Sequence, residues 1–402
     1  MNTFADSVQC VKIVTGDTLA TGNPRRGQAP MTDGDYTTEA QQARPSESQR
    51  DPAYLQERLQ KWLVGKHADA TVTSVELPSA NGMSSETVLA DATWGGEQHR
   101  LVVRVAPLTS SDPVFPSYDM DGQFKVMEYV GKTTDVPVPT CYWSESDPEP
   151  LGAPFIVMGR VDGLVPPDVM PYTFGSWVMD ATPEQRKTLQ NSAIGILAKV
   201  HTVPADDAPG VLRPEPGETA LASNIRRLRE FYDWASEGNR RAPILDEALD
   251  WVDANMPKTD AALLNWGDAR IGNVIFQDFE PAAVLDWEMA MLGPRELDLG
   301  WTIFLHRFFQ DLAELAGMPG LPDFMRRADC EAEYERLTGH KPENMDFYTA
   351  YAAIVHGVIM YRIQVRATEF GISPAPEDPN DMILHRSTIE KMLAGTYWEG
   401  IK

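Results

Sequence analysis

Residues 263–299, LLNWGDARIGNVIFQDFEPAAVLDWEMAMLGPRELDL, decide how the rest of the chain is interpreted. Short apolar runs in this stretch flank two polar segments, WGDARIGN and DWE, which predicts strand, loop, strand, loop. Asp268 and Asn273 stand five residues apart on the first loop, and Asp286 ends the next apolar run. The stretch therefore collects three side chains with hard oxygen atoms on two successive loops.

These three side chains suit phosphoryl transfer. That reaction needs a carboxylate to orient the attacking hydroxyl, and hard oxygen ligands to hold Mg²⁺ against the phosphates of a nucleotide. Structural roles compete with this interpretation, because Asp, Gly and Asn are common turn residues and an isolated Asp often caps a helix. The spacing of all three residues, with apolar runs on either side, favours catalysis.

Toward the N-terminus, the sequence changes character near Pro52. Residues 1–52 hold only Phe4 and Tyr36 as aromatic residues, among many Thr, Gln, Gly and Pro, so we expect a disordered arm. Residues 53–158 then predict a small lobe with a helix, an antiparallel sheet, a second helix and two extended segments. These segments are 54–63, Ala70–Leu77, Glu86–Trp94, His99–Ala106, Asp119–Gly131, 136–143 and 153–163.

Toward the C-terminus, residues 159–402 are predicted to be mainly helical outside the stretch quoted above. Residues 182–202 show a Thr-Pro-Glu start signal followed by apolar residues on one side. The expected fold class is therefore α+β, with a small sheet lobe and a larger helical lobe. The other predicted helices are Ala220–Ala235, Pro243–Ala254, Asp298–Leu315, Cys330–Leu337, Met345–Phe370 and Asp381–Ala394.

The spacing Asp-x4-Asn, with Asp286 after a hairpin-like return, resembles the catalytic and metal loops of the aminoglycoside phosphotransferase and choline kinase branch of the kinase-like superfamily. The resemblance extends over about residues 55–395. It implies a two-lobed protein-kinase-like fold and transfer of the γ-phosphoryl group of ATP, or of GTP, to a hydroxyl of a small molecule. It also implies that Asp268 is the catalytic base and that Asn273 and Asp286 bind Mg²⁺.

The resemblance further assigns nucleotide-binding residues to the small lobe. Residues 82–85 look like the family's loop whose backbone N–H groups meet the phosphates, and Phe155–Val161 resembles the hinge that contacts the adenine edge. At the hinge, the carbonyl of Gly159 and the amide of Val161 would make these contacts. The residues expected in the loop and hinge are Gly82, Met83, Ser84, Ser85, Met158, Gly159 and Val161.

Three positions depart from the family's pattern. Arg104 stands where the family has the lysine that reaches the phosphates, and Gln123 stands where it has the partner glutamate. Arginine can grip phosphate through two parallel hydrogen bonds, and an Arg–Gln pair can still hydrogen-bond, so a variant active site is expected. The same departures, with Trp266 in place of the family's common histidine, motivate an alternative function as a nucleotide sensor without turnover.

Three further residues complete the expected site. Arg270, two residues after the base, would neutralise charge on the transferring phosphoryl group, as cations do in protein kinases; a structural salt bridge is the competing role. Glu288 is expected to assist the metal. Asp298 is expected to brace the catalytic loop.

The composition limits the partners and the compartment. The formal net charge of −24 repels nucleic acid and anionic membranes, so neither is expected as a partner. Three scattered cysteines without a CxxC pair, and an N-terminus without a continuous apolar core, predict a cytoplasmic protein. Seven histidines show no metal-binding spacing. The oligomeric state stays open.

The acceptor substrate stays open between two chemical classes. Substrate contacts in this family come from the helical lobe, whose loops decide specificity. The chain resembles aminoglycoside kinases and also the phosphotransferase domains joined to acyl-CoA dehydrogenases, so an aminoglycoside-like sugar and a hydroxylated acyl metabolite are both candidates. A regulatory binding module that needs no nucleotide is a third class of function.

Overall fold

The computed structural model of the protein describes residues 50–78, 85–107 and 113–401. Residues 1–49 of the expected disordered arm lie outside the described residues, so that arm stays a prediction. Gly82, Met83 and Ser84 of the expected phosphate loop also lie outside them. Ser85 is the member of that loop that can be placed.

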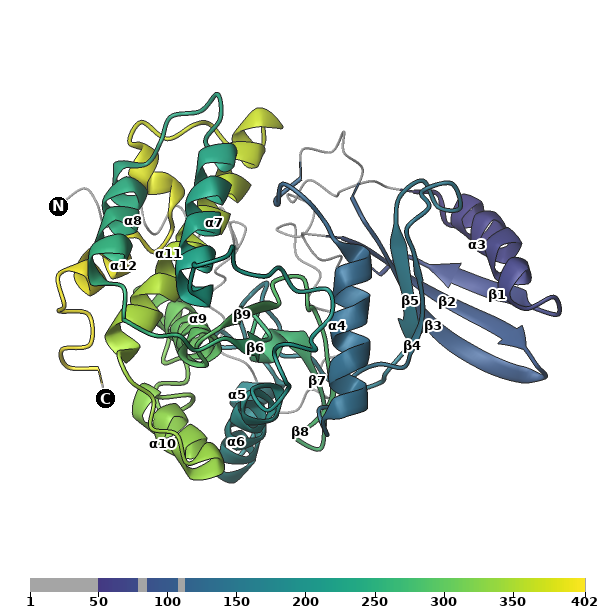
Figure 1. Ribbon diagram of the computed structural model, residues 1–402, viewed down its shortest axis with the longest axis horizontal. Helices are drawn as coiled ribbons and strands as arrows, with labels where there is room; N and C mark the ends of the chain where they lie inside the picture. The colour runs from purple at the N-terminus through teal and green to yellow at the C-terminus, as the bar shows by residue number, and fades with distance from the viewer. Residues whose placement is uncertain (1–49, 79–84, 108–112, 402) are drawn as a thin grey trace, which may run out of the picture.

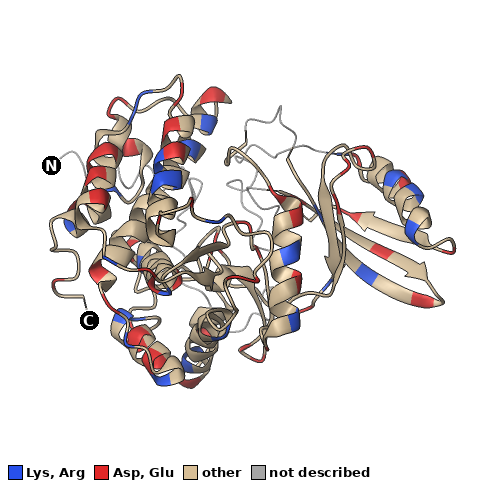
Figure 2. Ribbon diagram, viewed as in Figure 1, with Lys and Arg blue, Asp and Glu red and all other residues tan. Residues whose placement is uncertain are grey.

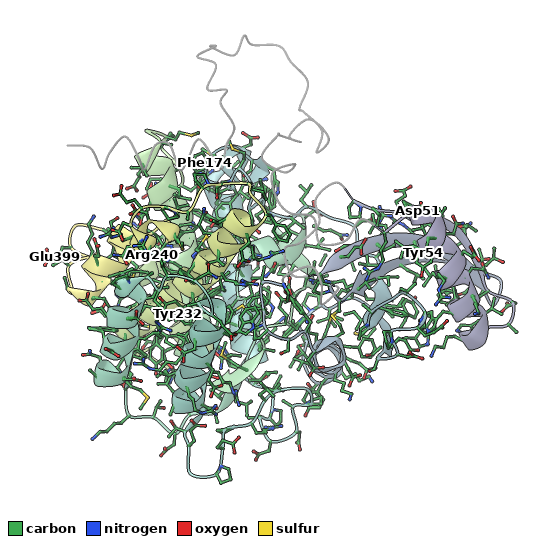
Figure 3. The ribbon with its side chains drawn as sticks, turned by 90° about the horizontal axis from the view of Figure 1, so that it is seen from above. Asp51, Tyr54, Phe174, Tyr232, Arg240 and Glu399 are labelled. Atoms are coloured by element: carbon green, nitrogen blue, oxygen red, sulfur yellow. The ribbon has the colours of Figure 1, made fainter. Side chains whose placement is uncertain are left out.

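The described residues form two lobes that stand side by side (Figure 1). Seen from above, Asp51 and Tyr54 lie at the outer end of the small lobe, whereas Tyr232 and Arg240 lie in the large lobe (Figure 3). The small lobe holds a sheet with two helices, and the large lobe is mainly helical. This architecture confirms the predicted α+β fold class.

A five-stranded antiparallel sheet forms the body of the small lobe. Its strands lie in the order β1-β2-β3-β5-β4. Along β2, side chains alternate between buried and half-buried positions, because successive residues of a strand point to opposite faces of the sheet. The strands are β1 (Thr71–Glu76), β2 (Glu86–Trp94), β3 (Glu97–Val105), β4 (Cys141–Glu145) and β5 (Phe155–Gly159).

Two helices pack on this sheet. Helix α3 (Pro52–Lys66) starts after Asp51, whose side chain accepts a hydrogen bond from the helix N-terminus, and it packs against β1. Helix α4 (Met120–Thr133) starts after Asp119, which caps it in the same way, and it packs against β4 and β5. In Figure 1, α4 lies between the sheet and the large lobe. Residues of α4 can therefore line the junction of the lobes.

Two long helices build the core of the large lobe. Helices α9 (Glu296–Leu315) and α11 (Met345–Glu369) pack against each other, and most of their residues are buried. Gly300 permits the close approach, because a Cβ at this position would lie 2.8 Å from backbone atoms of Tyr348. The other helices are α5 (Trp177–Asp180), α6 (Pro183–Val200), α7 (Ala220–Ala235), α8 (Pro243–Asn255), α10 (Arg327–Thr338) and α12 (Arg386–Leu393).

Acidic and basic residues are interspersed on the exposed helices of both lobes (Figure 2). On α4, Lys125 pairs with Asp121, and Lys132 pairs with Glu128, each about one helical turn away. Exposed pairs of this kind contribute little to stability. None of the helices in the described ranges combines the length and the apolar character that crossing a bilayer requires.

Short strands at the junction carry the stretch of sequence quoted first. The hairpin β7–β8 turns at Asp278 and Phe279, whose φ angles are 50° and 68°, and a two-residue turn with both angles positive matches the twist of the flanking strands. A short 3₁₀ turn, η3, immediately precedes the hairpin. Strand β6 (Leu263–Asn265) pairs with β9 (Met291–Gly293). Strand β7 (Val274–Gln277) follows η3 (Ile271–Asn273) and pairs with β8 (Glu280–Val284).

The segment that leaves β5 is tied to this hairpin. Leu164 and Phe276 exchange two backbone hydrogen bonds, at 2.9 and 2.8 Å. Gly163, with φ of 150°, lies so close that a Cβ would stand 2.5 Å from the Ile275 side chain and 2.6 Å from the Phe276 carbonyl oxygen. The connection between the lobes is therefore fixed to β7 before it enters the large lobe.

The helix predicted over residues 381–394 is wrong in extent. The structure has a 3₁₀ turn, η4 (Pro379–Met382), followed by the shorter helix α12. Ile383 and His385, at the break, are buried, and the His385 ring bonds to the carbonyl of Ala353 on α11 at 2.8 Å. Tertiary packing against α11 thus overrides the local helical pattern.

Gly300→Ala should lower the free energy of unfolding by about 1–3 kcal/mol, because the added methyl group meets backbone that must shift. Gly195→Ala on α6 is the matched control, since nothing lies within 4 Å of its Cβ position. That change should be neutral or stabilising by up to about 1 kcal/mol. Denaturant unfolding followed by circular dichroism measures both, and equal stabilities would contradict the packing described for α9 and α11.

Candidate active site

The loop of residues 266–273, which is expected to be catalytic, leaves β6 at a sharp turn that α9 holds in place. Gly267 has φ of 89°, and a side chain there would collide with the carbonyl of Met289, so glycine is required. Asp298, fully buried in the first turn of α9, accepts hydrogen bonds from the amides of Trp266 (2.7 Å) and Gly267 (2.8 Å). These bonds fix the backbone immediately before Asp268.

Helix α9 makes two more contacts with the same loop. Trp301 Nε1 donates to Asp268 Oδ1 at 2.8 Å, and the Thr302 hydroxyl donates to the carbonyl of Ala269. Asp298, Trp301 and Thr302 are three and four residues apart, so they lie on one face of the helix. This face of α9 positions both the backbone and the carboxylate of Asp268.

A buried hydrogen-bond network supports Asp298 from the other side. His201 Nε2 lies 3.2 Å from Asp298 Oδ2, and His201 Nδ1 lies 2.7 Å from the Tyr334 hydroxyl. An ionised carboxylate only accepts hydrogen bonds, so with a neutral imidazole Nε2 donates to Asp298 and Nδ1 accepts from Tyr334. Burial raises the pKa of Tyr334 above its ordinary value, which keeps the phenol protonated as a donor.

Side-chain donors surround the carboxylate of Asp268. Arg270 Nε lies 3.0 Å from both of its oxygens, and Asn273 Nδ2 donates to Oδ2 at 2.7 Å. Asn273 Nδ2 also donates to the backbone carbonyl of Asp268 at 3.1 Å. The loop thus brings Asp268, Arg270 and Asn273 into direct contact.

Arg270 bridges two carboxylates, those of Asp268 and Asp168. Its Nε faces Asp268, and its Nη1 contacts Asp168 Oδ2. Burial works to lower the pKa of Arg270, but the Asp168 and Asp268 carboxylates outweigh burial, so the pKa lies above its ordinary value. The salt bridge that the sequence raised as a competing role for Arg270 is therefore present.

Asp286 follows β8 in a left-handed backbone conformation, with φ of 58°. Trp266 Nε1 holds this turn by donating to the carbonyls of Leu285 (2.9 Å) and Asp286 (3.2 Å). Asp286 Oδ2 lies 3.3 Å from Arg104 Nη1, whereas its Oδ1 is buried and accepts no hydrogen bond from the described residues. Such a conformation costs about 1–3 kcal/mol in a non-glycine residue and is typical of functional loops.

Asn273 and Asp286 present oxygen atoms that suit Mg²⁺. Within the described ranges, neither the side-chain oxygen of Asn273 nor Oδ1 of Asp286 accepts a hydrogen bond. No group of three or more His, Cys, Asp or Glu side chains there could hold a metal ion. A magnesium ion held by this pair would complete its coordination with water and phosphate oxygens, as is usual at nucleotide sites, so the donor set fits.

Arg104 extends from β3 to the second loop of the site. Its Nε and Nη2 donate to Ser85 Oγ at 2.8 and 2.6 Å. Burial works to lower the pKa of Arg104, but Asp286 and Glu288 raise it, and the net pKa lies above the ordinary value. Within the described residues, Arg104 pairs with Ser85 and Asp286, not with Gln123.

A cavity of about 150 Å³ lies between the lobes, beside Arg104 and the hinge. Most of its lining is apolar, as is typical of small-molecule sites. The amide of Val161 makes none of the hydrogen bonds found in the described part of the chain, so it is available to a ligand. The lining residues are Thr87, Val102, Arg104, Gln123, Met127, Pro139, Ile156, Met158, Gly159, Val161, Ile275, Leu285, Asp286 and Trp287.

Sequence reasoning missed Asp168, His201 and Trp301 as residues of this site. Asp168 belongs to the segment after the hinge, and no motif marks it. Trp301 shares a helix face with Asp298, but an amphipathic helix that packs on a core gives the same spacing. His201 lies at the end of α6, far from the loop in sequence. Nothing in the sequence pattern distinguishes these three residues from core residues.

Residues 77–345 match the model of the phosphotransferase enzyme family. The chain is 25% identical over 325 residues to acyl-CoA dehydrogenase family member 10 of Mus musculus, a match that covers 75% of this chain and 28% of that protein. It is also 25% identical over 294 residues to a candidate acyl-CoA dehydrogenase of Arabidopsis thaliana, a match that covers 68% of this chain and 34% of that protein. The chain spans about a third of the length of these curated relatives.

Solved structures include similar folds. A candidate aminoglycoside phosphotransferase from Ralstonia eutropha has a TM-score of 0.59 at 22% identity, with 85% of this chain and 96% of that chain covered. A macrolide 2'-phosphotransferase from Brachybacterium faecium has a TM-score of 0.51 at 16% identity, with 84% and 98% covered. An aminoglycoside phosphotransferase in complex with GDP and kanamycin has a TM-score of 0.53 at 13% identity, with 83% and 98% covered.

These likenesses confirm the predicted two-lobed, kinase-like fold. The family match extends over more than half of the 402 residues. It includes both loops of the site, with Asp268, Asn273 and Asp286. The family predicted from these loops is confirmed, and the chain belongs to the phosphotransferase enzyme family.

Proposed function

We propose that the protein transfers the γ-phosphoryl group of ATP to a hydroxyl group of a small molecule, with Mg²⁺ bound at the nucleotide phosphates. The observation that carries the proposal is the contact of Asp268 with Asn273 on a loop that α9 fixes, together with the side-chain oxygens of Asn273 and Asp286 that accept no hydrogen bond within the described residues. In this arrangement Asp268 would orient a hydroxyl once a donor around its carboxylate gives way, and Asn273 and Asp286 would hold a metal.

In this proposal, Asp268 orients the acceptor hydroxyl and accepts its proton as the phosphoryl group transfers. Asn273 keeps the Asp268 carboxylate in place through its 2.7 Å hydrogen bond. Bound Mg²⁺ would neutralise phosphate charge and align the γ-phosphate, held by Asn273 and Asp286, with Glu288 as a further candidate ligand. Arg270 adds positive charge beside the base.

The nucleotide base would lie in the cavity between the lobes. The amide of Val161, which makes no hydrogen bond within the described residues, and the carbonyl of Gly159 would meet the edge of the base, with Met158 beside them. Arg104 and Ser85 would face the phosphates, with Gln123 on the same wall. Backbone contacts at the hinge are compatible with ATP and with GTP, so GTP is the alternative donor.

The acceptor remains a proposal with two chemical classes. The curated relatives carry acyl-CoA dehydrogenase names, which supports a hydroxylated acyl metabolite as acceptor. The formal net charge of −24 would attract a cationic aminoglycoside-like sugar. The cytoplasm stays the predicted compartment, on the basis of the scattered cysteines.

Two ion pairs of the site favour a second function, a nucleotide sensor without turnover. Asp286, the expected metal ligand, forms an ion pair with Arg104 at 3.3 Å, and Arg270 covers the carboxylate of the expected base. If these pairs persist when the nucleotide binds, ATP would bind without transfer of its γ-phosphoryl group.

Asp268→Asn should reduce phosphoryl transfer by about 10²–10⁴-fold, the usual contribution of a general base, with nearly unchanged affinity for Mg-ATP. Purified protein is incubated with Mg²⁺ and γ-labelled ATP in a fractionated metabolite extract and, separately, with an aminoglycoside panel. Asp260→Asn, at an exposed position, controls for the loss of one charge. Full turnover in Asp268→Asn would contradict its role, and ATP binding without any labelled product would favour the sensor.

Asp286→Asn should weaken binding of Mg-ATP by at least about tenfold, since even changes around a metal ligand commonly cost 10–100-fold in affinity. Binding of ATP in EDTA should change much less. Isothermal titration calorimetry measures both. Asp278→Asn, which also alters an aspartate with positive φ, is the matched control. An equal loss with and without Mg²⁺ would show that Asp286 acts through Arg104 and not through the metal.

A further inference from the structure

The carboxylate of Asp268 has no acceptor position left for a substrate hydroxyl. Its two oxygens offer about four lone-pair positions. Arg270 Nε lies 3.0 Å from both oxygens and shares its single N–H between them, Trp301 Nε1 also donates to Oδ1, and Asn273 Nδ2 also donates to Oδ2, so each oxygen faces two donor nitrogens. A hydroxyl group can therefore be accepted only after one of these donors leaves.

Arg270 is the donor that is free to leave. Asn273 is tied twice, to the carboxylate and to the backbone carbonyl of Asp268. Trp301 is 5% exposed and sits within the packed helix α9. The Arg270 side chain is long, keeps 22% of its surface exposed, and holds Asp268 through the single nitrogen Nε. Its other end already contacts a second carboxylate.

Asp168, on the segment between β5 and α5, has a free acceptor position for this guanidinium. Arg270 Nη1 contacts Asp168 Oδ2, whereas Oδ1 is buried and accepts no hydrogen bond from the described residues. Gly272 leaves the necessary space, because a Cβ there would lie 2.5 Å from Asp168 Oδ1 and 2.6 Å from Arg270 Nη1. A two-pronged pair of Arg270 with Asp168 would satisfy the second oxygen.

We propose that Asp168 is a positioning residue that draws Arg270 away from Asp268 when the acceptor hydroxyl arrives. The guanidinium would exchange its contact with Asp268 for a bidentate pair with Asp168, so it keeps a carboxylate partner throughout. Asp168 touches no reacting atom and acts through Arg270. The inference rests on the proposed phosphotransferase function, with Asp268 as the base.

A double-mutant cycle tests this role. Asp168→Asn keeps the shape of the side chain and removes its charge, so Arg270 should stay on Asp268. The kcat should fall about tenfold or more, as for the loss of one charge-assisted hydrogen bond, with nearly unchanged KM for ATP. In the Arg270→Ala background, Asp168→Asn should change nothing further, because the base is already uncovered.

The assay uses Mg-ATP with the acceptor found in the labelled extract, and Mg-ATP with water as acceptor in parallel. Asp250→Asn is the matched control, since it removes a surface partner of Arg229 at 3.0 Å and should leave kcat unchanged. Full kcat in Asp168→Asn, or an equal fall of kcat in both backgrounds, would overturn the inference and leave the phosphotransferase function standing.

A second readout does not depend on turnover. The indole N–H of Trp301 donates to Asp268, so its ¹⁵N–¹H NMR signal, assigned with Trp301→Phe, reports on the donors around that carboxylate. Asp168→Asn leaves Arg270 with Asp268 as its one carboxylate partner of the two, so the signal should shift in the otherwise unchanged protein. It should not shift in the Arg270→Ala background. If no form of the protein transfers phosphate, the proposed function fails. Separately, Asp168→Asn could shift the Trp301 signal equally with and without Arg270, or in neither case. Either result would overturn the link from Asp168 to Asp268.

Discussion

The two hydrogen bonds that Asp298 accepts from the amides of Trp266 and Gly267 are the constraint on which the site depends. A buried carboxylate needs donors, and buried amides in a sharp turn need an acceptor, so each group offsets the desolvation of the other. Because Asp298 belongs to α9, and α9 packs along α11, the core of the large lobe sets the position of Asp268. The geometry of the loop is therefore a property of the helical core.

The expected catalytic base and the expected metal ligand each form an ion pair with an arginine. Asp286 faces Arg104 across the junction of the lobes, and Asp268 faces Arg270 within its own loop. Charges buried in this way need partners, and the arginines supply them from the chain itself. On the proposed function, binding of phosphates and a hydroxyl would be an exchange of partners, in which each arginine would take a new acceptor.

The sequence indicates which residues of the two loops lie together better than it indicates the residues that support them. Asp268, Asn273 and Asp286 belong to one short stretch, so their spacing alone indicates their proximity, and the resemblance also places Arg104 at the same pocket as Gln123. Their supports come from distant segments: Asp168 from the interlobe connection, His201 from α6 and Trp301 from α9. Only tertiary packing brings these together. The helix predicted over 381–394 failed for the same reason, since packing against α11 decides where it breaks.

The interlobe connection is tied to one strand of each lobe on either side of Val161. The amide of Arg160 donates to the Arg100 carbonyl of β3 at 2.9 Å, and Gln277 of β7 donates to the Asp162 carbonyl at 2.7 Å. Val161 alone lies between these two backbone anchors, and the Asp162 side chain also pairs with Arg100 of β3. A nucleotide base held by the amide of Val161, as proposed, would therefore lie where the chain is tied to both lobes. Asp168 lies beyond the second anchor, so its contact with Arg270 lies within the large lobe.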